Sequence, residues 1–251
     1  MNELMFKLQN KAIYIKQNGP FSTYVLKMIA IVSMMVDHTA AVLVSHLRHM
    51  HMIADNPVLS AHAAKLYFVM RRFGRLAFPI FCFFIVEGFF RTRDVRKYVG
   101  RLLLFAFISE FPFDFALHHG QPFMHKQNVY FTLLIGLLVI WAVHDIFSGM
   151  IPVCLVIMIT GMMLAKFLKT DYNYHGVFLI ELLYVTRFSS FYQNACGAAY
   201  VSWYEGFPTP MSFLLTFLYN GKKGRSASRF FYWFYPVHLM LLGLITWVIL
   251  K

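Results

Sequence analysis

Charged residues are scarce in this chain: they make up 14% of its 251 residues, whereas 59% of the residues are hydrophobic. A soluble domain of this size typically has about 25% charged and about 45–50% apolar residues. No long polar stretch interrupts the apolar runs, so the sequence leaves no room for a separate soluble domain. The composition therefore predicts an integral membrane protein with several spans.

Cysteine is also rare, and the motifs of several enzyme classes are missing. Cys82, Cys154 and Cys196 lie in apolar surroundings and form no Cys-x-x-Cys pair, so we expect no disulfide framework. The sequence has no Gly-x-Ser-x-Gly nucleophile elbow, no Walker loop and no dinucleotide fingerprint. The histidines lack the spacing of a metal site, and we expect no bound metal.

The apolar runs predict an all-α, polytopic transmembrane helix bundle of about nine spans. About twenty apolar residues cross a bilayer as a helix. Residues 1–24 show no cleavable signal and are expected to be a cytoplasmic N-terminal segment, followed by a transmembrane domain over 25–251. Helices in 173–220 are expected to be short or broken. The expected spans are 25–46, 73–91, 101–117, 129–147, 150–168, 174–188, 191–204, 209–220 and 230–250.

The positive charges predict the orientation and one partner. The formal net charge is +12, and the cations lie between apolar runs, which favours contact with the lipid bilayer and its anionic headgroups rather than with nucleic acid. Cations cluster in 91–101 and in 222–229, so both loops and the N-terminus are expected on the cytoplasmic side. Four cations on the predicted outer side, which this orientation does not explain, are Arg48, Lys65, Arg71 and Arg72.

The pair Asp37 and His38 lies inside the first expected span. An ionisable residue near the centre of a membrane helix costs about 2.5–3.5 kcal/mol on insertion scales, so such residues face protein or water and are candidate functional sites. Lys27 lies eleven residues earlier, a spacing that places it on nearly the same helix face as His38 and about 16 Å away along the axis. Asp37 points about 100° away from His38 and is expected to orient another histidine or to face a partner of its own.

A second intramembrane histidine, His238, lies in the last expected span. It is about 12 Å from the start of that span, so it reaches a depth comparable to that of His38. It is either a catalytic residue or a core histidine that is hydrogen-bonded to a neighbour.

Three carboxylates in apolar sequence have two readings each. Glu87 could position a ligand or form an i,i+4 ion pair with Arg91. Glu110 and Asp114 could contact a cationic substrate or belong to a solvated helix end. The basic turn at 219–225, with Asn220, Lys222 and Lys223, either cradles a phosphate or anchors a cytoplasmic loop.

Several stretches resemble the TraX family of bacterial membrane proteins. They follow the order of the family over nearly the whole chain: Leu26-Lys27-x-Ile29-Ala30 with Met35-x-Asp37-His38, then 74–81, Arg101-Leu102-Leu103 with Ser109-Glu110-x-Pro112-Phe113-Asp114, then Tyr219-Asn220-Gly221-Lys222-x-Gly224, and Tyr235-Pro236-x-His238-Leu239. The founding member acts in the N-terminal acetylation of a conjugative pilin. The resemblance therefore implies a bacterial cytoplasmic-membrane acyltransferase that moves an acetyl group from acetyl-CoA to an amine, such as a peptide or pilin N-terminus.

A looser similarity extends to the membrane acyltransferase-3 group, whose first helix carries an Arg, ten residues and a His. Lys27 and His38 match that spacing, with Lys in place of Arg. A lysine cannot make the bidentate contacts to phosphate that an arginine makes. The resemblance implies catalytic roles for His38, Asp37 and His238. It also implies acetyl-CoA contacts for Lys27, Arg75, Arg93, Lys97, Arg101, Asn220, Lys222 and Lys223, and acceptor contacts for Arg75, Glu87, Glu110 and Asp114.

Two other functions stay open at this point. The acceptor could be a hydroxyl of a surface glycan, which would make the protein an O-acetyltransferase. Intramembrane Asp, Glu and His also mark proton relays, so a proton-coupled transporter is the competing class. The sequence shows no internal repeat of the kind that such transporters often have.

Overall fold

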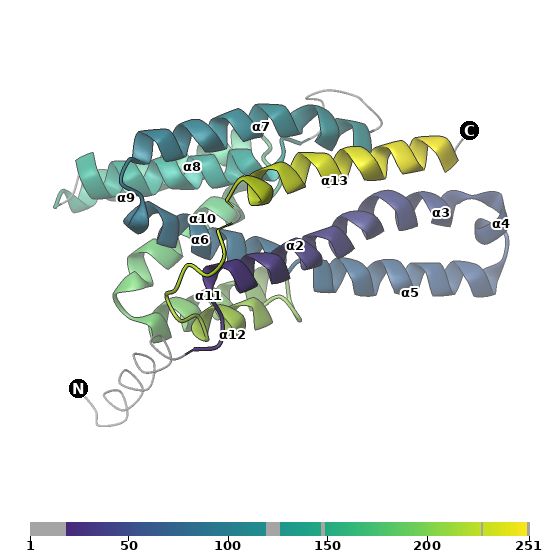
Figure 1. Ribbon diagram of the computed structural model, residues 1–251, viewed down its shortest axis with the longest axis horizontal. Coiled ribbons are helices and arrows are strands. Elements are labelled where there is room, and N and C mark those ends of the chain that lie inside the picture. Colours follow the sequence, from purple (N-terminus) through teal and green to yellow (C-terminus); the bar gives the residue numbers. More distant parts are fainter. Residues whose placement is uncertain (1–18, 119–125, 147–148, 227, 250–251) are drawn as a thin grey trace.

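The computed structural model describes residues 19–118, 126–146, 149–226 and 228–249, apart from the side chains of residues 49, 51, 52, 146 and 228. The predicted N-terminal segment lies almost wholly outside this range. The described residues form helices only, linked by short turns (Figure 1). These are α2 (Thr23–Thr39), the π-helix η1 (Ala40–Val44), α3 (Ser45–His49), α4 (His51–Ala54), α5 (Pro57–Gly74), α6 (Ala77–Arg91), α7 (Val95–Leu117), α8 (Val129–Trp141), the π-helix η2 (Ala142–Ile146), α9 (Ile151–Phe167), α10 (Asn173–Val185), the 3₁₀ helix η3 (Thr186–Phe188), α11 (Ser190–Tyr204), α12 (Met211–Phe217) and α13 (Ser228–Ile249).

The helical bundle confirms the predicted fold class. Within the described residues, three helical stretches are long and apolar enough to cross a membrane: Thr23–Arg48, Pro57–Arg91 and Arg229–Ile249. Shorter helices fill the region in which broken segments were expected, and α12 has only seven residues. Large apolar side chains on α7, α9 and α13 face outward, as expected for surfaces that contact lipid. They include Leu104, Phe107, Phe111, Val156, Ile159, Met163, Leu241, Ile245 and Val248.

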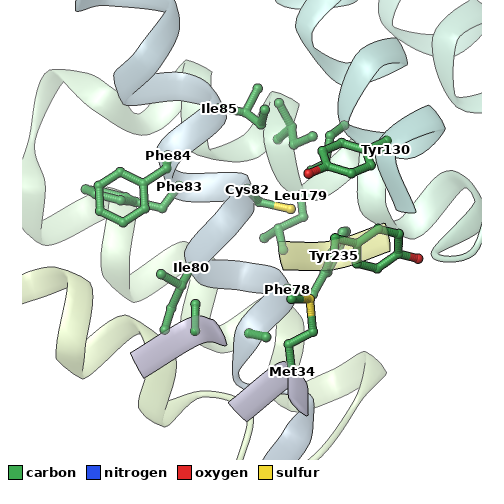
Figure 2. Close-up of a cluster of buried hydrophobic side chains, with 14 of the residues drawn as sticks. Met34, Phe78, Ile80, Cys82, Phe83, Phe84, Ile85, Tyr130, Leu179 and Tyr235 are labelled. Carbon is green, nitrogen blue, oxygen red and sulfur yellow. The ribbon is translucent and has the colours of Figure 1, made fainter. Parts of the chain in front are cut away.

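The core is built around α6, which is buried along most of its length. Figure 2 shows Phe78, Cys82 and Ile85 of α6 facing apolar side chains of α8, α10 and α13. The buried cluster continues on to α2 through Leu26, Ala30 and Met34. The first and last long helices, α2 and α13, therefore pack against the same central region and against each other (Figure 1).

The region 48–72 falls between two predicted spans, yet most of it is helical. Residues 57–91 form two almost continuous helices, α5 and α6, which return toward the start of α2 (Figure 1). Asn56 starts α5 as its N-cap, because its side-chain oxygen accepts hydrogen bonds from the backbone N–H groups of Val58 (3.1 Å) and Leu59 (3.2 Å). Arg71 and Arg72 thus belong to the last turn of a helix that docks on α2, and they do not lie in an outer loop.

The break between α5 and α6 is supported by α2. Pro79 lacks the N–H that would bond to the carbonyl of Arg75, so the helix cannot continue regularly through this point. The hydroxyl of Ser33 on α2 donates to the carbonyls of Phe73 (2.8 Å) and Gly74 (2.9 Å). The polar groups that the break exposes are therefore satisfied by a neighbouring helix inside the bundle.

Gly74 lies in direct contact with Asp37, where α5 meets α2. A Cβ atom built on Gly74 would lie 2.3 Å from Asp37 Cβ and 2.5 Å from its Cα. Because those are not the ends of a flexible side chain, the two helices can approach this closely only when residue 74 is glycine.

We therefore expect Gly74→Ala to lower the free energy of unfolding by about 1–3 kcal/mol, the usual cost of overpacking. The matched control is Gly100→Ala on the exposed side of α7, where an added Cβ meets nothing within 4 Å. Thermal unfolding in detergent should show a lower Tm for the first variant and an equal or higher Tm for the second. Equal Tm values for Gly74→Ala and wild type would contradict the close packing of α5 on α2.

Candidate active site

Two buried histidines from opposite ends of the chain meet inside the bundle. Nδ1 of His38 on α2 lies 2.6 Å from Nε2 of His238 on α13, and both residues are at least nine-tenths buried. The ring planes differ by 16° and the centroids are 4.9 Å apart, which fits an in-plane hydrogen bond between ring edges. The sequence places these residues at a similar depth, and the fold brings them into contact. The π-helix η1 begins two residues after His38, and such π turns often occur at functional sites.

The hydrogen bonds fix the tautomers of the neutral pair. Nδ1 of His238 lies 2.7 Å from the carbonyl oxygen of Phe234, and a carbonyl can only accept, so this nitrogen carries the proton. Nε2 of His238 then accepts from the Nδ1–H of His38. The remaining nitrogen of His38, Nε2, therefore has a free lone pair and can act as a base.

A buried tyrosine lies beside this pair. The ring centroid of Tyr235 is 5.7 Å from that of His38 and 5.8 Å from that of His238. Its hydroxyl is buried and donates to no acceptor in the described part of the chain. Tyr235 lies at the edge of the apolar cluster, and its hydroxyl points away from Phe78 and Cys82 (Figure 2). A buried O–H without an acceptor is costly unless a ligand uses it.

Asp37 does not touch the histidines but has a partner of its own. One carboxylate oxygen forms an ion pair with Arg71 of α5. The other is buried without a hydrogen-bond partner in the described residues. Of the two alternatives for Asp37, the structure thus shows a separate partner, and His238 is the group that contacts His38.

His38, Asp37 and Arg71 line a cavity of about 540 Å³, which we call the charged cavity. Arg75 also lines it and forms an ion pair with Glu205, the residue that ends α11. The neighbouring Arg72 donates to the carbonyls of Glu205 and Phe207, both at 3.1 Å. Two arginines at the break of α5 thus hold the end of α11 against the cavity wall.

Two further charged residues of the charged cavity form no ion pair with any residue that the structure describes. Asp171 lies in the turn between α9 and α10, and Lys126 lies just before α8. Lys169 and Asn173, on either side of Asp171, both have φ of 52°, a left-handed conformation that is uncommon outside glycine and concentrates at functional sites. The backbone N–H of Gln127 donates to the carbonyl of Lys169 (3.1 Å), so this turn is tied to the segment that carries Lys126.

A second cavity, of about 610 Å³, lies beside the N-terminus of α2 and is named here the basic cavity. Cations from four segments line it: Lys27, Arg91, Arg101 and Arg229. Its aromatic lining residues are Phe84, Tyr98, Phe105, Tyr219, Tyr232 and Trp233. The ammonium of Lys27 lies 5.2 Å from the ring centroid of Phe84. The two cation clusters of the sequence, 91–101 and 222–229, therefore meet at one end of the bundle.

Two small cavities lie between the basic cavity and the charged cavity, and each shares lining residues with one of them. The first, about 60 Å³, shares Lys27, Phe84, Tyr98 and Tyr232 with the basic cavity. The second, about 40 Å³, shares Asp37, His38, Asp171 and Tyr172 with the charged cavity, and Tyr235 also lines it. Phe81 lines both small cavities. The four cavities thus form a row along α6, with Phe81 between the two small ones and His38 at the far end.

Several residues predicted to bind acetyl-CoA lie outside the basic cavity. Lys97 is exposed and lies 3.4 Å from Asp94, while Arg93 is exposed on the loop before α7. In the basic turn, the carbonyls of Lys222 and Lys223 accept hydrogen bonds from the N–H groups of Thr23 (2.9 Å) and Tyr24 (3.2 Å). The turn therefore covers the N-terminus of α2, and both lysine side chains are exposed beside the cavity.

The side chain of Asn220 stabilises the turn itself. Its amide nitrogen donates to the carbonyl of Gly19 and its oxygen accepts from the N–H of Lys222, both at 2.9 Å. Gly221 and Gly224 adopt φ values of 75° and 70°, as expected for tight turns. This geometry gives Asn220 a structural role.

The three predicted acceptor-binding carboxylates are not gathered in one place. Glu87 lines the basic cavity, 2.8 Å from Arg91 and 3.2 Å from Arg187, so the predicted ion pair with Arg91 is present. Glu110 and Asp114 are both 3% exposed, so the alternative of a solvated helix end is wrong. Glu110 accepts hydrogen bonds from the backbone and side chain of Asn128, and Asp114 lies 3.3 Å from Nδ1 of His118.

Sequence reasoning missed Arg71, Lys126, Asp171, Glu205 and Tyr235 as site residues. For Arg71 a signal existed, because the carboxylate of Asp37 in a membrane helix requires a cation nearby. Asp171 lies in a five-residue polar gap between two apolar runs, and nothing in that pattern shows that the turn enters the bundle. Tyr235 is one of many aromatics at the start of α13.

Together these features define a multi-helix membrane protein in which a buried histidine pair lies beside the charged cavity, with His38 in its lining. The described residues contain no group of three or more His, Cys, Asp or Glu side chains that could hold a metal ion. The chain belongs to the TraX family, because the sequence model of that family, described as TraX protein, matches residues 22–246. It is also similar to a probable fimbrial assembly protein FimC of serogroup H1 from Dichelobacter nodosus, with 30% identity over 90% of this chain and 96% of the relative. No solved structure matches the chain.

Proposed function

We propose that this protein is an acetyltransferase of the bacterial cytoplasmic membrane that moves an acetyl group from acetyl-CoA to an amine. The observation that carries the proposal is the position of His38, whose Nε2 is unprotonated. This residue lines the charged cavity and lies at the end of the row of cavities that starts at the basic cavity. The name of the fimbrial assembly relative supports an acceptor related to fimbriae, such as a pilin N-terminus.

The basic cavity fits the phosphates of acetyl-CoA. Four cationic side chains line it, and its volume of about 610 Å³ lies within the common range for ligand sites. The aromatic walls offer stacking surfaces for the adenine ring. We place this end of the bundle, with the N-terminus of α2, on the cytoplasmic side, because both clusters of cations lie there. The row of small cavities along α6 would take the narrow thioester arm toward His38.

The chain's own residues supply acid–base chemistry at the far end of that row. His38 Nε2 removes a proton from the acceptor amine as the new C–N bond forms and the thioester C–S bond breaks. His238 holds the ring of His38 in its basic tautomer and accepts part of the positive charge that develops. The hydroxyl of Tyr235 is free to donate to the oxygen of the acetyl carbonyl, on which negative charge builds up. CoA leaves as the thiol through the basic cavity.

Replacing the base tests the proposal directly. We expect His38→Ala to lower acetyl-CoA-dependent transfer by about 10²–10⁴-fold, the usual contribution of general acid–base catalysis. His238→Ala should give a smaller loss, because it removes the partner of the base and leaves the base itself. The measurement is thiol release from acetyl-CoA by purified protein in lipid nanodiscs, with acetylated acceptor quantified by mass spectrometry.

The matched control is His62→Ala, which removes an exposed histidine far along α5. Its transfer rate should equal that of the wild-type protein. Full activity of His38→Ala would refute the proposed mechanism. Proton-dependent solute uptake without acetyl-CoA would favour the transporter instead, and transfer to glycan hydroxyls alone would favour O-acetylation.

The role of Tyr235 predicts a different kinetic change. We expect Tyr235→Phe to lower kcat by about 10²-fold, typical for the loss of one oxyanion donor, with little change in KM. Phenylalanine keeps the ring contacts with His38 and His238, so thermal stability should not fall. A variant with normal kcat would show that the hydroxyl has no part in transfer.

Acetyl-CoA binding can be assigned by comparing two basic residues of α7. Arg101 lines the basic cavity, whereas Lys97, four residues earlier, is paired with Asp94 outside its lining. We expect Arg101→Gln to raise the KM for acetyl-CoA about tenfold, since a charge-assisted hydrogen bond to phosphate is lost. Lys97→Gln is the matched control and should change that KM less than about twofold, as exposed charges contribute little. The reverse order of effects would move the phosphate site to the exposed face of the loop.

A further inference from the structure

We infer that Asp171 is the anchor for the acceptor and that it selects an amine that enters as an ammonium ion rather than a neutral hydroxyl. The inference deepens the proposed function and rests on it, since it names the substrate class of the same site. It starts from the charges of the charged cavity, of which only some are already paired.

The pairing of charges leaves one carboxylate available near the base. Asp37 is paired with Arg71, and Glu205 is paired with Arg75. Within the described residues, the carboxylate of Asp171 forms no ion pair and accepts no hydrogen bond. The remaining cation of the lining, Lys126, is exposed and has no ion pair there. Asp171 is therefore the one acidic residue of this lining whose charge is not met by a contacting arginine.

The position of Asp171 links it to the catalytic base. It lines the charged cavity together with His38, and both residues also line the adjoining cavity of about 40 Å³. A nitrogen atom held by Asp171 would thus lie in the space that His38 also faces. Tyr235 also lines the cavity of about 40 Å³, and its hydroxyl has no hydrogen-bond partner in the described residues. In the proposed reaction, the acetyl group arrives on this side.

The turn that carries Asp171 is built to hold this position. Left-handed backbone at Lys169 and Asn173 gives a sharp bend on each side of Asp171 and Tyr172. Tyr172 is stacked on Phe78 of α6, with ring centroids 3.4 Å apart. The N–H of Thr170 donates to the carbonyl of Ala165 (3.1 Å), which ties the turn to the end of α9. Strain of this kind persists where surrounding contacts fix it, and it commonly serves a site.

The chemistry of the two acceptor classes then differs. An ammonium ion would neutralise Asp171 and donate charge-assisted hydrogen bonds to it, whereas a hydroxyl would leave the carboxylate without a contacting cation. In the reaction, the ammonium first loses one proton through His38 to water in the charged cavity, because only the neutral amine has the lone pair that attacks the thioester. The second proton passes to His38 as the C–N bond forms and the C–S bond breaks, and it ends on the sulfur of CoA. Products are the acetamide, CoA thiol and one proton, so charge and atoms balance.

The test is a binding measurement that needs no turnover. Full-length protein in lipid nanodiscs is titrated with alanyl-phenylalanine amide, whose amine is protonated at neutral pH. The paired probe carries a weakly basic aminooxy group in place of the amine and is uncharged at that pH. We expect the wild-type protein to bind the cationic probe about 30-fold more tightly, the effect of one enclosed charge pair. In Asp171→Asn, which keeps the shape of the side chain, this ratio should fall to about one.

Lys126→Gln is the matched control, because it removes the opposite unpaired charge from the same cavity. It should keep the preference for the cation or increase it. Three outcomes would overturn the inference: a wild-type protein that does not prefer the cation, an Asp171→Asn variant that keeps the preference, or loss of the preference in both variants. If cation binding follows the expected pattern while acetyl-CoA yields no product, the proposed transfer fails and the ammonium site stands.

Discussion

The close contact of α2 with the break between α5 and α6 is the constraint on which the site depends. Gly74 lets the two helices approach until their backbones nearly touch at Asp37. That approach brings Arg71 to the carboxylate of Asp37 and brings the carbonyls at the break to the hydroxyl of Ser33. In hydrocarbon each of these groups would be costly alone, so their mutual satisfaction keeps α2 in one position. His38, the next residue after Asp37, is held in place by the same contact.

The polar groups inside the bundle fall into two sets with different roles. Charges that meet a partner, such as Asp37 with Arg71 and Arg75 with Glu205, hold helices together. Three groups with unused hydrogen-bonding capacity line the same small cavity of about 40 Å³: Nε2 of His38, the hydroxyl of Tyr235 and the carboxylate of Asp171. A hydrogen-bonding group left unpaired next to a cavity can bind a ligand there, and these three groups come from three different segments.

The sequence was informative wherever a pattern is local. Runs of apolar residues predict most of the helices. The distances of His38 and His238 from the starts of their helices predict a similar depth, and in the structure their ring nitrogens lie 2.6 Å apart. Position around a helix or in a turn depends on neighbours that no local pattern reveals. The sequence thus predicts an outer connection around the four cations of 48–72, which the structure places on helices. It predicts only a connecting turn around Asp171. Each of these needed the partner helix to be known before its role could be seen.

The two ends of α2 are completed by residues from the far end of the chain. Carbonyls of the turn at 219–224 cover the first N–H groups of α2, and His238 of α13 accepts the hydrogen bond from His38. During synthesis the first long helix therefore enters the membrane well before either partner exists, and contacts of such large sequence separation form late. Until α13 has inserted, the imidazole of His38 lacks the neighbour that fixes its tautomer. The proposed base therefore acquires its fixed tautomer only once α13 has packed against α2.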